Sequence, residues 1–334
     1  MPDTITDDEL PLHLLRRVLP DWLTRKGAIV DQDIREGKFQ RSLAVIAAIS
    51  SVFSGWEVTS EHYRGSYSQR VMYSPLLLSG ALLLAGLGGA INRTVARTVM
   101  PIVSVATMLD GLIGFFFHVR GIKRKPGGWR IPVFNIVMGP PLFAPLLFAL
   151  SGYLGVIASL LRREDAPSHP VIAELTGDHH PEWLDLLPAP LAERGRAFEG
   201  QAREGLLQRH LAAATAISAF LSCAEALYSH YKNNFRYWYE WTPIALGPVL
   251  IAGGVGAVAS RRLARTLLPI ASVLAMLDGA AGSFFHMRGV VRRPGGLKTP
   301  LYNWIHGPPI FAPLLFAASG FLGLLASLLR RSDS

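Results

Sequence analysis

Long apolar runs separated by short polar connections dominate the chain from residue 42 to residue 329. Eight windows carry almost no charge and supply the roughly 20 residues that a helix needs to cross a hydrocarbon core about 30 Å thick. The pattern predicts an all-α polytopic membrane protein with about eight transmembrane helices. The eight windows are 42–59, 75–92, 98–119, 131–161, 210–228, 243–260, 266–287 and 300–329.

Two of these windows are too long for a single straight helix. Residues 131–161 and 300–329 each contain a Gly-Pro-Pro sequence near their start, at Gly139 and at Gly307. Proline removes a backbone hydrogen-bond donor and breaks a helix. Each long window is therefore expected to begin with a short interfacial or re-entrant piece before the true span.

The sequence repeats itself at an offset of 168 residues, so that His118, for example, corresponds to His286. The strongest match is an eleven-residue run that starts at Gly139 and returns from Gly307, with Leu142 replaced by Ile310. The chain is therefore expected to contain two tandem four-helix repeats. The boundaries are an N-terminal segment (1–41), a first repeat (42–163), a cytoplasmic linker with an amphipathic helix (164–209) and a second repeat (210–331).

The predicted number of spans in each repeat decides how the two repeats are oriented. With four spans each, both repeats insert the same way up, as parallel repeats and not as an inverted pair. An amphipathic cytoplasmic segment precedes each repeat. A site present in both repeats must then lie at the same depth on the same side of the membrane.

Composition supports a lipid environment and argues against nucleic acid as a partner. The 334 residues are 50% hydrophobic and only 17% charged, with a mean hydropathy of +0.30, which is too apolar for an ordinary soluble domain. The formal net charge is +9, but the basic residues gather at the ends of the apolar windows. Anchoring and orientation in the bilayer explain them better than nucleic-acid binding.

The distribution of Lys and Arg predicts a cytoplasmic N-terminus, and a bacterial inner membrane is the expected location. Basic residues are frequent in the N-terminal segment, the second connection and the central connection. The loop at residues 120–130 is a counter-signal, because it places five basic residues on the predicted outer side. No secretory signal precedes the first window. The single cysteine, Cys223, excludes a disulfide within the chain.

Ionisable side chains inside apolar windows are the candidate functional residues. Each costs about 2.5–3.5 kcal/mol on insertion scales, so its presence suggests a function. A glutamate, an aspartate and two histidines occupy matching positions in the two repeats. The eight residues are Glu57, His62, Asp110 and His118 in the first repeat and Glu225, His230, Asp278 and His286 in the second.

Helix geometry predicts that these groups meet near the outer ends of the spans. The first and third spans of a repeat run in the same direction. At 1.5 Å per residue, Glu57 lies about 7 Å below His62 and Asp110 about 12 Å below His118. Histidine nitrogen and carboxylate oxygen are ligands of transition metals. The leading hypothesis is a metal site that holds iron, manganese or zinc for redox chemistry or electron transfer.

Several other functions remain open at this stage. The four histidines are alternative axial ligands for haem, as in a cytochrome-like protein. The acids and histidines also suit a proton- or cation-coupled transporter or channel, and the simplest alternative is a set of buried hydrogen bonds that fix helix packing in a non-catalytic subunit of a membrane complex. No nucleophile elbow, phosphate loop or zinc-protease helix appears in the sequence, so no reaction is predicted.

Two further repeated features are predicted to be structural. Glycines recur in the second span of each repeat, where small residues let helices approach closely. Asn135 and Asn303 precede the Gly-Pro-Pro sequences and are expected to satisfy the broken backbone there. The glycines are Gly86, Gly88, Gly89, Gly253, Gly254 and Gly256.

Overall fold

The computed structural model describes residues 38–161 and 206–329, with isolated positions at 29, 189, 190, 193 and 197. Within these residues every regular element is a helix. The predicted amphipathic segments, at 1–41 and in the linker 164–209, lie almost entirely outside the described residues.

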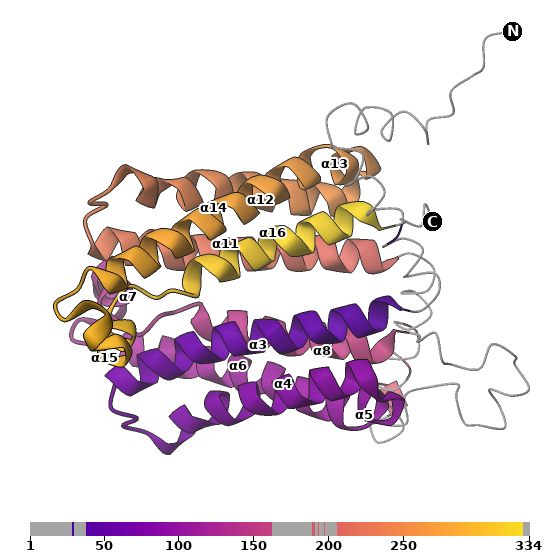
Figure 1. Ribbon diagram of the computed structural model, residues 1–334, viewed down its shortest axis with the longest axis horizontal. Coiled ribbons are helices and arrows are strands. Elements are labelled where there is room, and N and C mark those ends of the chain that lie inside the picture. Colours follow the sequence, from indigo (N-terminus) through magenta and orange to yellow (C-terminus); the bar gives the residue numbers. More distant parts are fainter. Residues whose placement is uncertain are drawn as a thin grey trace, which may run out of the picture.

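The first half of the molecule contains four long helices and several short ones. Figure 1 shows the long helices side by side, with α5 near one end of the molecule and α7 at the other. The helices are α3 (Phe39–Arg64), α4 (Ser74–Ile91), α5 (Arg93–Arg97), α6 (Val99–Lys123), α7 (Pro132–Val137) and α8 (Ala144–Leu160), with 3-10 turns at Arg70–Tyr73 and Gly128–Arg130.

The second half contains helices of nearly the same lengths in the same order. Both α3 and α11 have 26 residues, and both α8 and α16 have 17. The helices are α11 (Leu207–Lys232), α12 (Thr242–Ala259), α13 (Arg261–Arg265), α14 (Leu267–Val291), α15 (Pro300–His306) and α16 (Ala312–Leu328), with 3-10 turns at Trp238–Trp241 and Gly296–Lys298.

The chain is a helical membrane protein. Six helical segments within the described residues are long and apolar enough to cross a bilayer, namely those built on α3, α4, α6, α11, α12 and α14. Large apolar side chains point outward from them: Leu84 is 72% exposed and Phe284 is 65% exposed. Such a surface is unfavourable in water and suits contact with lipid.

The two long windows are divided as the Gly-Pro-Pro sequences predict. In the first, α7 ends at Val137, an irregular loop follows, and α8 begins at Ala144. In the second, α15 ends at His306 and α16 begins at Ala312. The remaining helices, α8 and α16, are about 26 Å long at 1.5 Å per residue. They fall below the length of the six clear spans, so the fold supports a helical membrane protein without deciding on eight spans.

Small residues allow the long helices of each half to pack closely, as predicted. A β-carbon on Gly86 would lie 2.7 Å from the carbonyl oxygen of Ala44, and one on Gly254 would lie 2.8 Å from that of Ala212. These glycines bring α4 against α3 and α12 against α11. Gly111 plays the same part between α6 and α8, where its β-carbon would lie 2.6 Å from the backbone nitrogen of Ala149.

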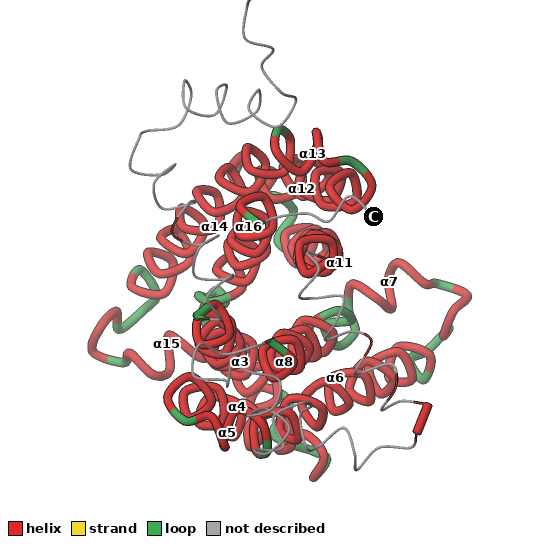
Figure 2. Tube along the Cα trace, turned by 90° about the vertical axis from the view of Figure 1, so that its right-hand side faces the viewer, coloured by secondary structure: helices red, strands yellow, loops and turns green. Residues whose placement is uncertain are grey.

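The two halves meet along α3 and α8 on one side and α11 and α16 on the other, as the end-on view in Figure 2 shows. At the end that carries α5 and α13, a continuous apolar core joins the halves, with Leu43 and Leu211 fully buried in it. At the opposite end, α7 contacts α11 and α15 contacts α3. The loops that interrupt the long windows therefore lie at the boundary between the halves.

Asn135 and Asn303 were expected to satisfy the broken backbone at Gly-Pro-Pro, but their amides instead bond to the Pro-Gly-Gly turns that precede α7 and α15. The side-chain amide of Asn135 donates to the carbonyl oxygens of Pro126 and Gly128, at 3.0 and 2.8 Å. Asn303 repeats the arrangement with Pro294 and Gly296. Both asparagines are 1% exposed, so these carbonyls have partners in a region that water does not reach.

Candidate functional site

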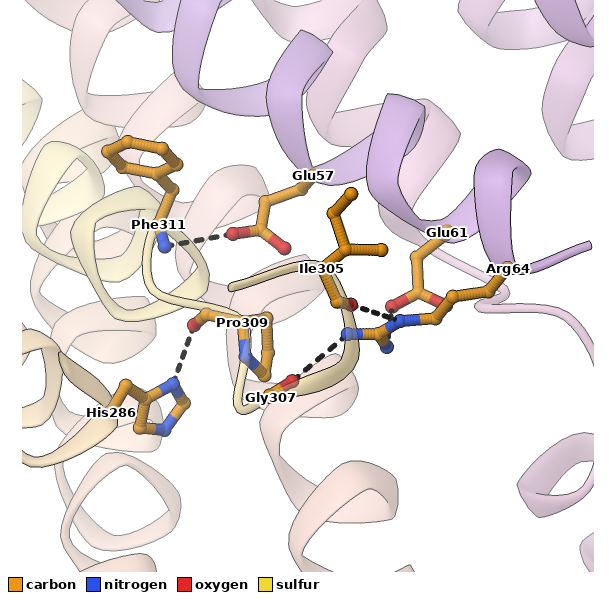
Figure 3. Close-up of polar contacts among 8 residues, drawn as sticks. All are labelled: Glu57, Glu61, Arg64, His286, Ile305, Gly307, Pro309 and Phe311. Atoms are coloured by element: carbon orange, nitrogen blue, oxygen red, sulfur yellow. Dashed lines mark hydrogen bonds and ion pairs between the residues drawn. The ribbon is translucent and has the colours of Figure 1, made fainter. Parts of the chain in front are cut away.

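Glu57 connects the two halves of the molecule. Its side chain leaves α3 and accepts a 2.8 Å hydrogen bond from the backbone N–H of Phe311, and the N–H of Ala312 also bonds to it. These two N–H groups start α16, after the Gly-Pro-Pro loop (Figure 3). Proline-rich loops leave such N–H groups without helical partners, and a carboxylate satisfies them while its charge meets the positive end of the helix.

Glu225 makes the reciprocal contact. It leaves α11 and accepts hydrogen bonds from the backbone N–H groups of Phe143 and Ala144, at the start of α8. Each half therefore supplies a carboxylate to the broken helix of the other half. Both glutamates are half-buried.

The same loops are held from their own half by histidines. The ring Nδ1 of His118 lies 2.5 Å from the carbonyl oxygen of Pro141, and that of His286 lies 2.6 Å from the carbonyl oxygen of Pro309. In Figure 3, Pro309 lies between His286 and the glutamate contact at Phe311. One loop residue, Ile310 or Leu142, thus lies between the carbonyl bound by a histidine of one half and the N–H bound by a glutamate of the other.

Arg64 adds a contact that the sequence analysis missed. It extends from the end of α3 and donates to the carbonyl oxygens of Ile305 and Gly307, at 2.6 and 3.0 Å. Glu61 accepts a third hydrogen bond from the guanidinium at 2.8 Å and orients it. The second half carries Ser229 and Lys232 at the matching positions. That difference between the halves could have indicated a special role for Arg64, but its backbone partners cannot be identified from the sequence.

Asp110 contacts the hydroxyl group of Ser74, which lies within hydrogen-bond distance of two acceptor atoms. The Ser74 hydroxyl lies 2.6 Å from a carboxyl oxygen of Asp110 and 2.7 Å from the carbonyl oxygen of Val71. A hydroxyl carries one hydrogen, so it cannot donate to both acceptors. Thr242 repeats the arrangement with Tyr239 and Asp278. A proton on each aspartate would supply the missing donor.

All four predicted histidines have one ring nitrogen engaged by a backbone carbonyl. His62 bonds to Met72 at 2.8 Å and His230 to Glu240 at 2.7 Å, in addition to the two loop contacts of His118 and His286. A carbonyl oxygen only accepts, so each Nδ1 carries a hydrogen and each Nε2 of the neutral ring has its lone pair available. In the first half the ring centroids of His62 and His118 are 6.5 Å apart.

The expected meeting of four groups in each repeat is realised only in part. His62 lies near His118, and Asp110 interacts electrostatically with His62. Glu57 instead bonds to the backbone of the other half. The described residues contain no group of three or more His, Cys, Asp or Glu side chains arranged to hold a metal ion.

Comparison with known proteins adds no assignment to this geometry. No family model, curated protein or solved structure matches the chain. The function must therefore be argued from the contacts between the two halves.

Proposed function

We propose that this chain is a proton-coupled transporter or channel in which Glu57 and Glu225 carry the coupling protons. The observation that carries the proposal is the reciprocal contact: each half-buried carboxyl group binds the broken helix of the opposite half. Buried ionisable groups at such a boundary are typical of proton relays in membrane proteins.

Protonation changes the strength of this contact. A charged carboxylate makes strong hydrogen bonds to the two N–H groups and is attracted to the positive end of the helix. A protonated carboxyl group has lost that charge. Uptake of a proton by Glu57 or Glu225 therefore weakens the contact between the halves, and release of the proton strengthens it.

The charged groups near the two glutamates differ. Glu57 interacts electrostatically with Glu61 and Arg64, and Glu225 interacts with Lys232 and with the same Glu61. Glu61 thus influences both carboxyl groups from one position. Because like charges raise the energy of ionisation and opposite charges lower it, the two glutamates should bind their protons in sequence.

The aspartates provide further proton positions in this proposal. When Asp110 and Asp278 hold protons, they can donate to the hydroxyl groups of Ser74 and Thr242, which then donate to the carbonyl oxygens of Val71 and Tyr239. The Nε2 atoms of His62 and His118 are available proton acceptors in the same half. Each half then contains a short series of proton-accepting groups that ends at the loop bound by the other half's glutamate.

The proposed architecture is two parallel four-helix repeats with eight spans. Helices α8 and α16, at 17 residues each, reach the lower limit for crossing a bilayer. We place the end of the molecule that carries α5 and α13 on the cytoplasmic side of a bacterial inner membrane, because each of these short helices carries at least two arginines. The glutamates then lie nearer the outer face.

Proton movement in vesicles tests the proposal. Purified protein is reconstituted with an internal pH-sensitive dye, and inorganic ions, amino acids and sugars are added in turn with and without an imposed membrane potential. Proton flux above that of empty vesicles is expected, and it should be lost in Glu57→Gln and Glu225→Gln but kept, with a shifted pH dependence, in Glu61→Gln. Flux equal to that of empty vesicles for every solute would leave a non-catalytic membrane subunit as the better explanation.

A second candidate function is binding of iron, manganese or zinc by the histidine pairs. The specific observation in its favour is the carbonyl contact at Nδ1 of every one of these histidines. Metal-binding histidines commonly donate their second ring nitrogen in this way, which directs the other nitrogen to the metal. Haem with His62 and His118 as ligands is the related alternative.

Elemental analysis and an optical spectrum distinguish these alternatives. Stoichiometric metal that is lost in His118→Gln and His286→Gln would support the histidine sites, and an intense haem absorption band would select haem. Metal-free protein that binds none of the three ions after dialysis against them would eliminate this candidate.

A further inference from the structure

A cavity of about 430 Å³ opens at the end of the molecule that carries α7 and α15. The first half contributes the end of α3 and the turn that leads to α4, and the second half contributes the end of α15. Its lining residues are Tyr63, Arg64, Ser66, Tyr67, Tyr73 and His306.

Hydrogen-bond donors dominate this lining. Arg64 uses three N–H groups for Ile305, Gly307 and Glu61, and a guanidinium has five, so two remain. Tyr63, Tyr73, Ser66 and His306 add hydroxyl and imidazole donors. Among the lining residues that the structure describes, none has a carboxylate.

The matching place in the second half is chemically different. Its two aromatic residues also stack, since Phe235 lies 3.9 Å from Trp241 where Tyr67 lies 4.3 Å from Tyr73. However, both phenol hydroxyls are gone. The residues at the positions that match Arg64, Ser66, Tyr67, Tyr73 and His306 are Lys232, Asn234, Phe235, Trp241 and Met138. The second half keeps ammonium, amide and indole donors, so the combination of a guanidinium with an imidazole and the hydroxyls of Tyr67 and Tyr73 belongs to one side of the molecule only.

We propose that this cavity binds a phosphate group. Phosphate oxygens accept several hydrogen bonds and carry negative charge, which matches a lining of donors around a guanidinium. The cavity lies beyond the apolar part of the helices, beside exposed Tyr63 and Tyr302, at the level where aromatic residues meet lipid headgroups. The phosphate comes either from an anionic phospholipid or from a soluble phosphate.

Binding at this place would also act on the contact between the halves. Arg64 holds the carbonyl oxygen of Gly307, and the same loop ends at Phe311, which Glu57 binds. A phosphate that fixes Arg64 therefore stabilises the loop. The proposal rests on the cavity and requires no transport activity, so its failure and that of the proposed function are separate outcomes.

Direct binding to the purified full-length protein in a neutral detergent tests the proposal. The probes are inorganic phosphate, a short-chain phosphatidylglycerol and, as a neutral comparison, the corresponding phosphatidylcholine. We expect saturable binding of at least one anionic probe with a higher Tm. Phosphatidylglycerol alone would identify a lipid site, and both anions would identify a site for phosphate from either source.

The residues at the matching positions of the second half suggest which substitutions to make in the cavity. Arg64→Lys and His306→Met introduce the residues found at Lys232 and Met138, and each should weaken binding at least tenfold. Tyr231→Phe, at the position that matches Tyr63, should leave binding unchanged. Ser66→Ala, on the exposed turn, is a milder variant if the others fold poorly. No binding of either anion, or equal binding by wild type and all three cavity variants, would overturn the proposal.

Discussion

Glu57 on α3 accepts a hydrogen bond from the backbone N–H of Phe311, 254 positions later in the chain. Glu225, in the second half, accepts the equivalent hydrogen bond from the backbone N–H of Phe143 in the first half. The association of the two halves therefore depends on two carboxyl groups near the C-terminal ends of apolar helices.

Substitution of these glutamates should lower the free energy of unfolding, and more so when the hydrogen-bond acceptor is lost than when only the charge is lost. Glu57→Gln keeps a hydrogen-bond acceptor but removes the charge, and should cost about 1 kcal/mol. Glu57→Ala leaves the N–H of Phe311 without a partner and should cost about 1–3 kcal/mol. Unfolding followed by circular dichroism during a titration with a denaturing detergent measures both. Glu61→Gln on the same helix removes an exposed ion pair and should change stability by less than about 1 kcal/mol.

A protonated aspartate gives a spectroscopic signature. If Asp110 and Asp278 hold protons to complete the hydrogen bonds of Ser74 and Thr242, the protein at neutral pH contains carboxylic acid C=O groups inside its helices. The infrared band of these groups should be present in wild type and lost in the double variant Asp110→Asn, Asp278→Asn. A neutral-pH spectrum that is the same for wild type and variant would show that both aspartates are ionised.

Close helix packing predicts a marked difference between two glycines. Gly111→Ala would place a β-carbon 2.6 Å from the backbone nitrogen of Ala149, which forces α6 and α8 apart. We expect a loss of about 1–3 kcal/mol. Gly80→Ala is the matched control, since nothing lies within 4 Å of its β-carbon and alanine favours helix by up to about 1 kcal/mol. Equal effects of the two substitutions on Tm would contradict the packing described above.

The turns before the Gly-Pro-Pro loops depend on amide donors. Asn135→Asp replaces two donated hydrogen bonds with an acceptor that faces the carbonyl oxygens of Pro126 and Gly128. The basic loop at residues 120–130 should then be cut faster by trypsin, because its anchor is lost. Asn92→Asp should have no such effect, as aspartate also caps the start of α5. Unchanged cleavage in Asn135→Asp would mean that other contacts hold the turn.

The sequence predicted the helical class and the divided windows because each depends on local chemistry. Apolar length and proline act within a few residues of their own position. The partner of Glu57 was beyond such reasoning, since it is a backbone N–H with no distinguishing side chain. The separation of five positions between Glu57 and His62 turns the two side chains roughly 140° apart around the helix. Glu57 therefore faces the other half while His62 stays with its own.

Asp110 and Glu57 illustrate the same distinction. The sequence placed both acids towards the outer ends of two helices and suggested one common site. Asp110 found its partner in Ser74 of the neighbouring helix α4, within its own half. The arrangement of the two halves, which no local pattern specifies, decided which acid could take part in a contact between them.

The reciprocal glutamate contacts also impose an order on biosynthesis. Glu57 enters the membrane with the first long helix, but its backbone partners at residues 311 and 312 belong to the last one. During translation this acid must therefore remain protonated, solvated or bound by another protein until α16 has been made. A chain that stops after α14 contains Glu225 and its backbone partners at the start of α8, but its Glu57 lacks the N–H groups that it binds in the full chain.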